Sequence, residues 1–201
     1  MIQAVIFDIG GVLIRTENHR PRREWEEKLG LAARQSEDIV FGSEMGAKAQ
    51  RGDVTDEALW AWVGQRLSLE QTELAAFRRD FWAGDVLDVA LVEFIRRLRP
   101  RYQTAVISNA TDGLRASLTH QFHIDDAFDL IVGSAEERVM KPDALIFERA
   151  LARLGRQPQE AVFVDDFAHN IAAAQALGLH TIHFQPGTNV PAELAQLGVT
   201  P

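Results

Sequence analysis

Hydrophobic residues follow two alternating patterns along the chain. Short, nearly continuous apolar runs occur at five places: Ala4–Phe7, Thr104–Ile107, Leu130–Val132, Ala161–Val164 and Thr181–Phe184. Runs of this kind are typical of strands that are buried on both faces of a parallel sheet. Amphipathic stretches with a helical period lie between most of them. The alternation predicts an α/β protein with a Rossmann-like, doubly wound parallel sheet.

Residues 17–83 interrupt this rhythm. They contain no strand-like run but several helical patterns, and Ser68 with Gln71 predicts a capping box at the start of one helix. We expect an all-helical insert after the first strand, and a core domain made of residues 1–16 and 84–201. The insert also holds all the tryptophans, Trp25, Trp60, Trp62 and Trp82. Most of them are expected in its own small core, and one of them could face a substrate.

Composition narrows the possible functions. The 201-residue chain is 46% hydrophobic and 25% charged, with a net charge of −8, which argues against a nucleic-acid or anionic-membrane partner. Four arginines near the insert's start, Arg15, Arg20, Arg22 and Arg23, are expected on a solvated helix start, with attraction of an anionic substrate tail as the alternative. The chain has no cysteine, so disulfides and thiolate metal sites are excluded. No signal peptide or membrane-spanning run is evident, which predicts a cytoplasmic protein and leaves its oligomeric state open.

Polar residues follow three of the five predicted strands. They are Asp8, then Ser108 and Asn109, then Asp165 and Asp166 with Asn170 one helical turn later. An ordinary turn explains any one of these positions. The carboxyl ends of parallel strands share one edge of the sheet, however, and ligands of open α/β sheets bind at that edge. The three positions together therefore predict one site.

Three carboxylates in one site repel one another unless a cation lies between them. Oxygen ligands without cysteine favour a hard ion, Mg²⁺ before Ca²⁺. The alternative for one of the paired residues, Asp165 or Asp166, is the N-cap of the following helix. Lys141 is one of only three lysines in a chain that otherwise uses arginine, and it precedes Pro142 in an extended segment. A lysine here indicates a need for a compact positive charge.

These motifs together resemble the haloacid dehalogenase (HAD) superfamily. The four segments "VIFDIGGVL", "VISNA", "MKPDALIF" and "VFVDDFAHNIAAAQALG" resemble its four motifs in order, and the helical insert lies where the C1-type cap of subfamily I lies. The resemblance implies a hydrolase in which Asp8 is the nucleophile and forms an aspartyl-phosphate. It also implies phosphoryl binding by Ser108, Asn109 and Lys141. Mg²⁺ would be bound by Asp8, the Gly10 carbonyl, Asp165 and Asp166, with Asn170 supporting these ligands from outside.

One position departs from the usual phosphatase pattern. Gly10 stands where HAD phosphatases usually carry an acid/base aspartate, although one phosphatase branch also reads Asp-x-Gly followed by Gly. A dehalogenase or a phosphonatase would also lack this aspartate, and the latter would need a cap lysine, Lys28 or Lys48. The retained acidic pair favours a Mg²⁺-dependent phosphomonoester hydrolase that acts on a small phosphorylated metabolite of the sugar-phosphate type. A catalytically silent member that binds a phosphometabolite or a protein stays open, and a signalling receiver domain fits poorly.

The two glycines after Asp8 carry a further expectation. We expect Gly10 and Gly11 to let the backbone turn tightly and pass close to a metal and a phosphate. Losing the acid/base group at Gly10 removes a role worth about 10²–10⁴-fold in rate. The chain should then favour substrates with an acidic leaving group. Hydrolysis of the aspartyl-phosphate should also be slow, unless a residue of the insert such as Glu17, His19 or Glu44 supplies the missing base.

Overall fold

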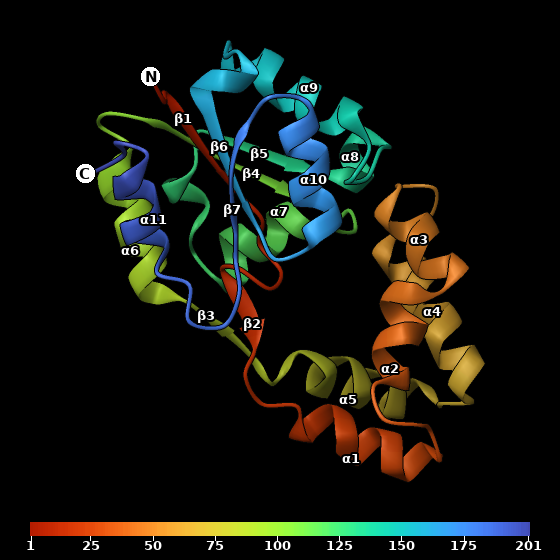
Figure 1. Cartoon of the computed structure of the whole chain (residues 1–201). Coiled ribbons are helices and arrows are strands. Elements are labelled where there is room, and N and C mark those ends of the chain that lie inside the picture. The colour runs from red at the N-terminus through yellow and green to blue at the C-terminus, as the bar shows by residue number, and fades with distance from the viewer.

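The centre of the molecule is a parallel sheet. The computed structural model describes residues 1–201, and its five sheet strands are ordered β5-β4-β1-β6-β7 (Figure 1). Their bounds are β1 (Ala4–Phe7), β4 (Gln103–Ser108), β5 (Leu130–Gly133), β6 (Ala161–Asp165) and β7 (His180–His183). All neighbouring strands are parallel. The five predicted runs match these strands to within one residue at each end, so the predicted α/β class is confirmed.

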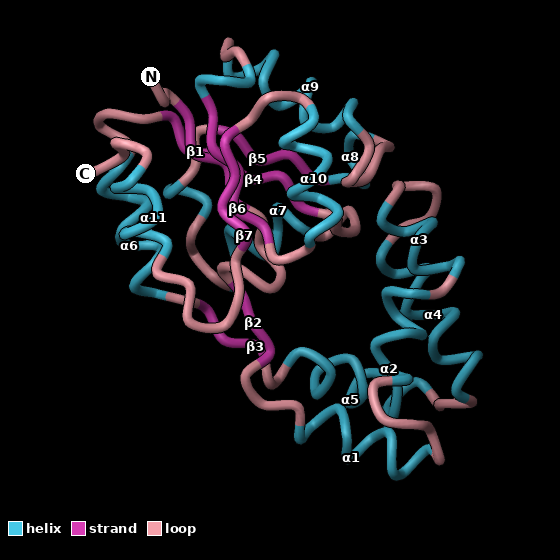
Figure 2. The backbone as a smooth tube through the Cα atoms, in the orientation of Figure 1, coloured by secondary structure: helices cyan, strands magenta, loops and turns pink.

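Helices cover both faces of this sheet (Figure 2). Val5 and Phe7 belong to a hydrophobic cluster with α6 (Val89–Leu98) and α11 (Val190–Gln196). Their neighbours in β1, Ala4 and Ile6, belong to a second cluster with the helices of the other face, α9 (Ala144–Leu154) and α10 (Ala168–Ala176). Successive strand residues point to opposite faces, so a strand covered on both sides must be apolar throughout. This burial explains the continuous apolar runs.

The helical insert has a hydrophobic core of its own. Its helices are α1 (Arg20–Leu29), α2 (Gln35–Glu37), α3 (Glu44–Gln50), α4 (Asp56–Leu67) and α5 (Gln71–Trp82), with a helical turn at Asp38–Gly42. Trp25 and Trp60 are buried there against Phe77 and Phe81, while Trp82 is exposed. The separate core accounts for a chain segment with apolar helical stripes and no strand.

The predicted capping box in the insert is wrong. Helix α4 continues to Leu67, and Ser68 ends it in the left-handed conformation with a φ of 54°. The next helix starts after Glu70, whose side chain makes no capping hydrogen bond. Ser68 cannot both close one helix with its backbone and open the next with its hydroxyl. Gly155 ends α9 in the left-handed conformation, with a φ of 67°.

Two short antiparallel strands join the insert to the core. β2 (Ile14–Thr16) pairs with β3 (Asp85–Leu87), and the Thr16 hydroxyl donates to the Asp85 carboxylate at 2.6 Å. The sequence did not predict this pair, because three residues are too few for a periodic pattern. The core also contains the short helices α7 (Leu114–Ala116) and α8 (Ser134–Glu137), with helical turns at Ser117–Gln121, Asp125–Ala127 and Pro158–Glu160.

The insert also touches the core through α3 and α8, which lie side by side in Figure 1. The buried Ser134 hydroxyl donates to the Gln50 carbonyl at 2.6 Å and accepts from the Ala110 amide at 3.0 Å. Nearby, the Asp112 carboxylate accepts from the Asp56 amide at 2.8 Å. The insert is therefore held at two places, by the paired linkers and by these hydrogen bonds.

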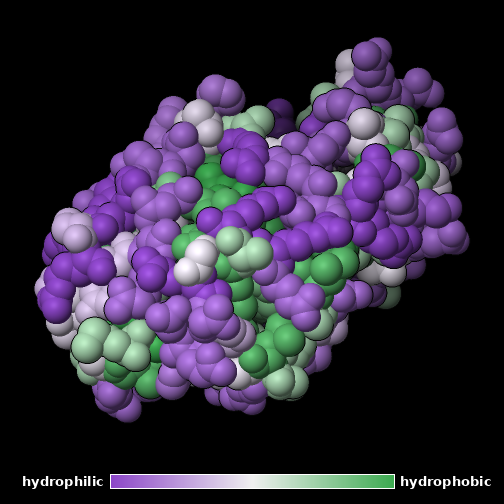
Figure 3. Space-filling model, turned by 90° about the horizontal axis from the view of Figure 1, so that it is seen from above, coloured by the Kyte–Doolittle hydropathy of each residue, from purple (hydrophilic) through white to green (hydrophobic).

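Polar residues cover most of the face seen in Figure 3, with hydrophobic patches between them. None of the helices combines the length and the apolar character that crossing a membrane requires. Among the large hydrophobic side chains that are exposed, Phe41, Trp82 and Phe167 line the cleft between the insert and the core.

Candidate active site

The carboxyl edge of the sheet gathers the acidic residues. Asp8 follows β1, Asp165 ends β6 and Asp166 comes next. One carboxylate oxygen from each of these three lies within 4.8 Å of the other two. Ser108, which is almost completely buried, ends β4 at the same edge and lines the cleft. The parallel topology thus brings together residues that are more than 150 positions apart.

Lys141 forms ion pairs with two of these carboxylates. Its side chain is buried, and Nζ lies 2.9 Å from Oδ2 of Asp8 and 2.7 Å from Oδ2 of Asp165. A lysine that is this deeply buried needs such partners, because an unpaired charge would lose too much hydration. The pairs hold a positive charge directly beside Asp8.

Asn109 positions the segment that carries Lys141. Its Nδ2 donates to the Lys141 carbonyl at 2.9 Å, and its Oδ1 accepts from the Lys141 amide at 2.8 Å. The side-chain amide therefore joins the end of β4 to this loop through two hydrogen bonds. Sequence reasoning missed this role, because a contact over 32 positions leaves no local signal.

Asp165 has hydrogen-bond partners on both of its oxygens. Oδ1 accepts from the Phe167 amide at 2.7 Å and from Nδ2 of Asn170 at 3.0 Å, while Oδ2 also binds Lys141. The residue is completely buried and does not line the cleft. The expected N-cap role for one of the pair is only partly met. Phe167 occupies the N-cap position of α10, and Asp165 binds its amide without capping the helix.

Asp166 differs sharply from its neighbour. It lines the cleft, and its Oδ1 is buried without any hydrogen-bond partner. Gly11 lies against it with a φ of +78°, and a Cβ atom on Gly11 would come within 2.1 Å of Oδ2. A carboxylate oxygen with no partner is costly in a buried site, so this atom is the one in the cluster that most needs a ligand.

The electrostatic environment makes the ionised form of two carboxylates unfavourable. Burial raises the pKa of Asp8 to about 6, with the nearby Asp165 acting in the same direction and Lys141 opposing it. Burial, followed by the charge of Asp165, also raises the pKa of Asp166. A divalent cation bound between Asp8 and Asp166 would remove both penalties.

Of the three residues of the insert that could replace the missing acid/base group, two line the cleft and one does not. Glu17 and His19 line the cleft. Glu44 lies outside it and forms an exposed ion pair with Lys48 at 3.0 Å. Lys28, the other lysine of the insert, pairs with Glu73 at 3.0 Å and is also outside the cleft. The cleft therefore contains no lysine from the insert for Schiff-base chemistry.

Arg22 corrects the expectation of a solvated arginine cluster. Arg20 is exposed, but Arg22 is buried and packs over the Phe81 ring. Its guanidinium donates to Glu37 at 3.0 Å and to Asp85 at 2.9 Å. The arginine links α1 to Glu37 of α2 and to Asp85 of the linker strand β3. The pattern of residues along one helix cannot show such partners.

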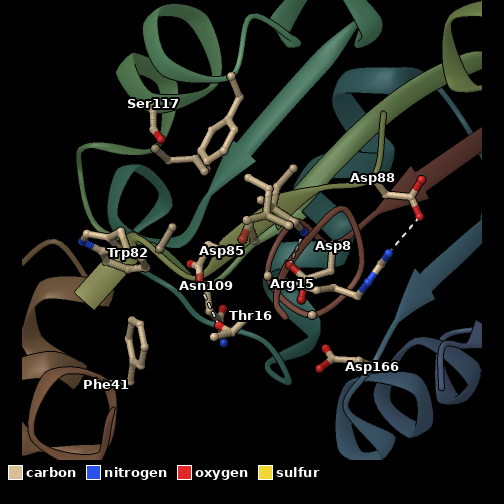
Figure 4. A pocket seen from close by; sticks show the side chains of 18 of the residues that line it. Asp8, Arg15, Thr16, Phe41, Trp82, Asp85, Asp88, Asn109, Ser117 and Asp166 are labelled. Atoms are coloured by element: carbon tan, nitrogen blue, oxygen red, sulfur yellow. Dashed lines mark hydrogen bonds and ion pairs between the residues drawn. The ribbon is translucent and has the colours of Figure 1, made fainter. Parts of the chain in front are cut away.

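Figure 4 shows how the cleft is divided. Phe41 and Trp82 lie together on one side, on elements of the insert, and Asp8 and Asp166 lie on the other. The two ring centroids are 5.7 Å apart in an edge-to-face arrangement. Trp82 is 38% exposed and lines the cleft, so it is the tryptophan for which contact with a substrate stays a prediction.

A parallel α/β core with three carboxylates and a lysine at its carboxyl edge, covered by a helical insert, defines the class of this protein. The chain belongs to the haloacid dehalogenase-like hydrolases, whose family model matches residues 2–178. The resemblance that the four motifs indicated is therefore confirmed.

Three known proteins illustrate the similarity. Sesquiterpene phosphatase astK of Aspergillus oryzae is 26% identical over 97% of this chain and 96% of its own length. Acyl-CoA dehydrogenase family member 10 of Mus musculus is 30% identical over 98% of this chain, which spans only 19% of that protein. A HAD family enzyme of Bacteroides thetaiotaomicron, crystallised with magnesium and inorganic phosphate, is 20% identical and superposes with a TM-score of 0.81, covering 96% of this chain and 99% of its own.

Proposed function

We propose that this chain is a cytoplasmic, Mg²⁺-dependent phosphomonoester hydrolase that acts on a small phosphorylated metabolite through an aspartyl-phosphate on Asp8. The observation that carries the proposal is that one site contains both a buried Lys141–Asp8 ion pair and a carboxylate oxygen, Oδ1 of Asp166, that has no hydrogen-bond partner. The phosphatase named among the relatives, and the magnesium and phosphate bound by the Bacteroides enzyme, support the same activity.

The residues of this chain fit a magnesium ion. Asp8 and Asp166 offer carboxylate oxygens, the orphaned Oδ1 of Asp166 lacks any other partner, and the Gly10 carbonyl is a third expected ligand. When bound, Mg²⁺ would neutralise charge on the phosphoryl group. Asp165 is better suited to a different role, because both its oxygens are already engaged by Lys141, Asn170 and the Phe167 amide. We assign it to holding Lys141 in place.

The positions of these side chains support the following reaction. A carboxylate oxygen of Asp8 attacks phosphorus, the bond from phosphorus to the leaving oxygen breaks, and an aspartyl-phosphate forms. Lys141 stabilises the charge on the transferring phosphoryl oxygens, together with Ser108 and the backbone amide of Asn109. Water then cleaves the aspartyl-phosphate and releases phosphate. Gly10 offers no proton, so the leaving alcohol takes one from water or from a residue of the helical insert.

The helical insert is proposed to act as a lid on this site. Residues 17–83 would move as one domain over a core of residues 1–16 and 84–201, with the paired β2 and β3 as the hinge. Closure would exclude water and strengthen the interaction of Lys141 with the phosphoryl group.

Turnover of acetyl phosphate and p-nitrophenyl phosphate with and without Mg²⁺ tests this proposal. We expect Mg²⁺-dependent release of phosphate, and at least a 10³-fold loss in Asp8→Asn, whose amide is isosteric but a poor nucleophile. Circular dichroism of Asp8→Asn checks that the fold is retained. Metal-independent release of halide from a 2-haloacid would instead support the dehalogenase alternative. Binding of phosphometabolites without any turnover would support a catalytically silent member.

A further inference from the structure

The side of the cleft that faces the catalytic edge presents an aromatic surface, formed by Phe41 and Trp82. Phe41 is 43% exposed and Trp82 is 38% exposed. Single exposed apolar side chains are common on protein surfaces. These two are different, because they adjoin each other in a concave site that also contains Asp8 (Figure 4).

The aromatic surface is held rigidly from behind. Phe81, which is completely buried, lies 5.5 Å from the ring of Phe41 and 5.0 Å from the ring of Trp82. Trp60 adds an edge-to-face contact to Trp82 at 6.4 Å. Preorganised aromatic groups lose little conformational entropy when a ligand packs on them, which favours binding of an apolar group.

The charged residues on this side of the cleft are already neutralised. Arg22 is paired with Glu37 and Asp85, and Arg78 is paired with Asp56 and Glu57. Arg34 and His19, the other basic residues of the insert that line the cleft, both lie against Glu37. No unpaired cation of the insert is thus available for a second phosphate or a carboxylate on the substrate, and such a group would meet an excess of carboxylates.

We propose that the helical insert binds an uncharged, mainly apolar organic group of the substrate on Phe41 and Trp82, while the phosphoryl group sits at Asp8. This inference rests on the phosphatase function proposed above and narrows its substrate class. The preferred substrate is a monophosphate with a hydrocarbon-rich alkyl, isoprenoid-like or aryl group. A phosphorylated acid or a bisphosphate is disfavoured, because the cations that its second charged group would need are already paired with carboxylates. A sugar phosphate, which the sequence predicts, is also disfavoured, because its hydroxyl groups would lie against aromatic rings.

A set of matched monophosphates separates these classes. The n-alkyl phosphates from ethyl to octyl have leaving groups of nearly equal acidity, so their kcat/KM values report burial of the chain alone. We expect kcat/KM to rise about two- to fourfold for each of the first added methylenes. Pentyl phosphate should exceed both ribitol 5-phosphate and a five-carbon phosphate ending in a carboxylate by at least tenfold. The polyol has the more acidic leaving group, so leaving-group chemistry cannot produce that preference.

Variants locate the effect on the aromatic surface. In Trp82→Ala and Phe41→Ala, kcat/KM should rise much less with alkyl chain length than in wild type. Their turnover of acetyl phosphate should change by less than threefold, which shows that both variants fold. Trp62→Ala is the matched control, because Trp62 lies on α4 outside the cleft and packs against the core of the insert. It should keep the full slope.

The outcomes distinguish this inference from the function on which it rests. A flat series, or ribitol 5-phosphate turned over faster than pentyl phosphate, in an enzyme active on acetyl phosphate would overturn the apolar-substrate inference alone. Equal slopes in wild type and Trp82→Ala would do the same. No Mg²⁺-dependent turnover of acetyl phosphate would overturn the phosphatase function, and this inference with it.

Discussion

Gly11 packs directly against the carboxylate of Asp166: a Cβ atom on Gly11 would lie 2.1 Å from Oδ2 of Asp166. Its φ of +78° is also one that favours glycine. At Gly10, by contrast, no heavy atom lies within 4 Å of the corresponding Cβ position. Of the two glycines that follow Asp8, only Gly11 is required by contacts within the chain; that Gly10 leaves room for a metal and a phosphate stays a prediction.

The open space at Gly10 predicts that Gly10→Asp gains activity. Wild type should prefer aryl over alkyl phosphates, because an acidic leaving group departs without a proton. The new carboxyl can donate that proton, and general acid catalysis is typically worth about 10²–10⁴-fold. We expect alkyl phosphate turnover to rise at least tenfold and the aryl-to-alkyl ratio of kcat/KM to fall.

Rapid-quench kinetics and the neighbouring glycine provide the controls. With an aryl phosphate, wild type should show a burst from slow hydrolysis of the aspartyl-phosphate, and Gly10→Asp should lose it. Gly11→Ala should instead weaken Mg²⁺ activation, because its methyl group displaces Asp166. An unchanged aryl-to-alkyl ratio in Gly10→Asp would mean that another residue already supplies the proton.

The strands, the helical insert and the polar strand ends were predictable from the sequence because each depends on local patterns. Continuous apolar runs identify buried parallel strands, and parallel topology then places Asp8, Ser108 and Asp165 at one edge. The difference in hydrogen bonding between Asp165 and Asp166 was not predictable. Asp165 and Asp166 are adjacent and identical, and only their surroundings show that one is fully hydrogen-bonded and the other has an unpartnered oxygen.

Pairings across the insert were also invisible to sequence reasoning. Arg22 lies only two positions from the exposed Arg20, yet it is buried and reaches Asp85 over 63 positions. Such contacts depend on how α1 is set against the linker strands, which no periodic signal along α1 encodes. The same holds for Asn109, whose partner Lys141 lies in a different motif.

Substitutions of Asp165 and Asp166 should have different effects, one on stability and the other on Mg²⁺ dependence. Asp166→Asn should raise the Mg²⁺ concentration for half-maximal activity by at least tenfold while the protein stays folded, because the side chain lines the cleft and its replacement breaks no hydrogen bond of Oδ1. Asp165→Asn should lower stability by about 3–5 kcal/mol, because it breaks a buried ion pair with Lys141. Its Mg²⁺ dependence should change little. Metal titrations of activity and urea unfolding measure the two effects, and a large shift in Mg²⁺ dependence for Asp165→Asn would show that it is a metal ligand.

The raised pKa values predict that magnesium binding depends on pH. The pKa of Asp8 is raised to about 6 by burial, and that of Asp166 is raised as well. Folding therefore favours the protonated acids, so their contribution to stability is fully present below about pH 4 and is lost as the pH rises toward 6. Magnesium requires the ionised forms and should restore this stability. Thermal unfolding should show a small Mg²⁺-induced rise in Tm at pH 5 and a larger one at pH 7.5; equal rises would contradict the assignment.

The contact between the helical insert and α8 can be tested with two matched glycines. Gly52 has a φ of +72°, and a Cβ atom there would lie 2.2 Å from the Ala135 carbonyl oxygen; Gly30 has a φ of +66° and open space at its Cβ position. Alanine at either position carries the same backbone cost, about 1–2 kcal/mol. Only Gly52→Ala should also push α3 away from α8 and break the Ser134–Gln50 hydrogen bond.

We expect Gly52→Ala to lower kcat/KM for acetyl phosphate by about tenfold or more, since a displaced lid no longer excludes water or aligns the substrate. Hydrogen exchange of the Gln50 and Asp56 region should become faster in the same variant. Gly30→Ala should lose only stability, with kcat/KM close to wild type. Because both variants share the backbone strain, any difference in catalysis between them comes from the contact itself. Equal kcat/KM in the two variants would mean that this contact does not hold the lid in its active position, and that the paired strands β2 and β3 alone set its orientation.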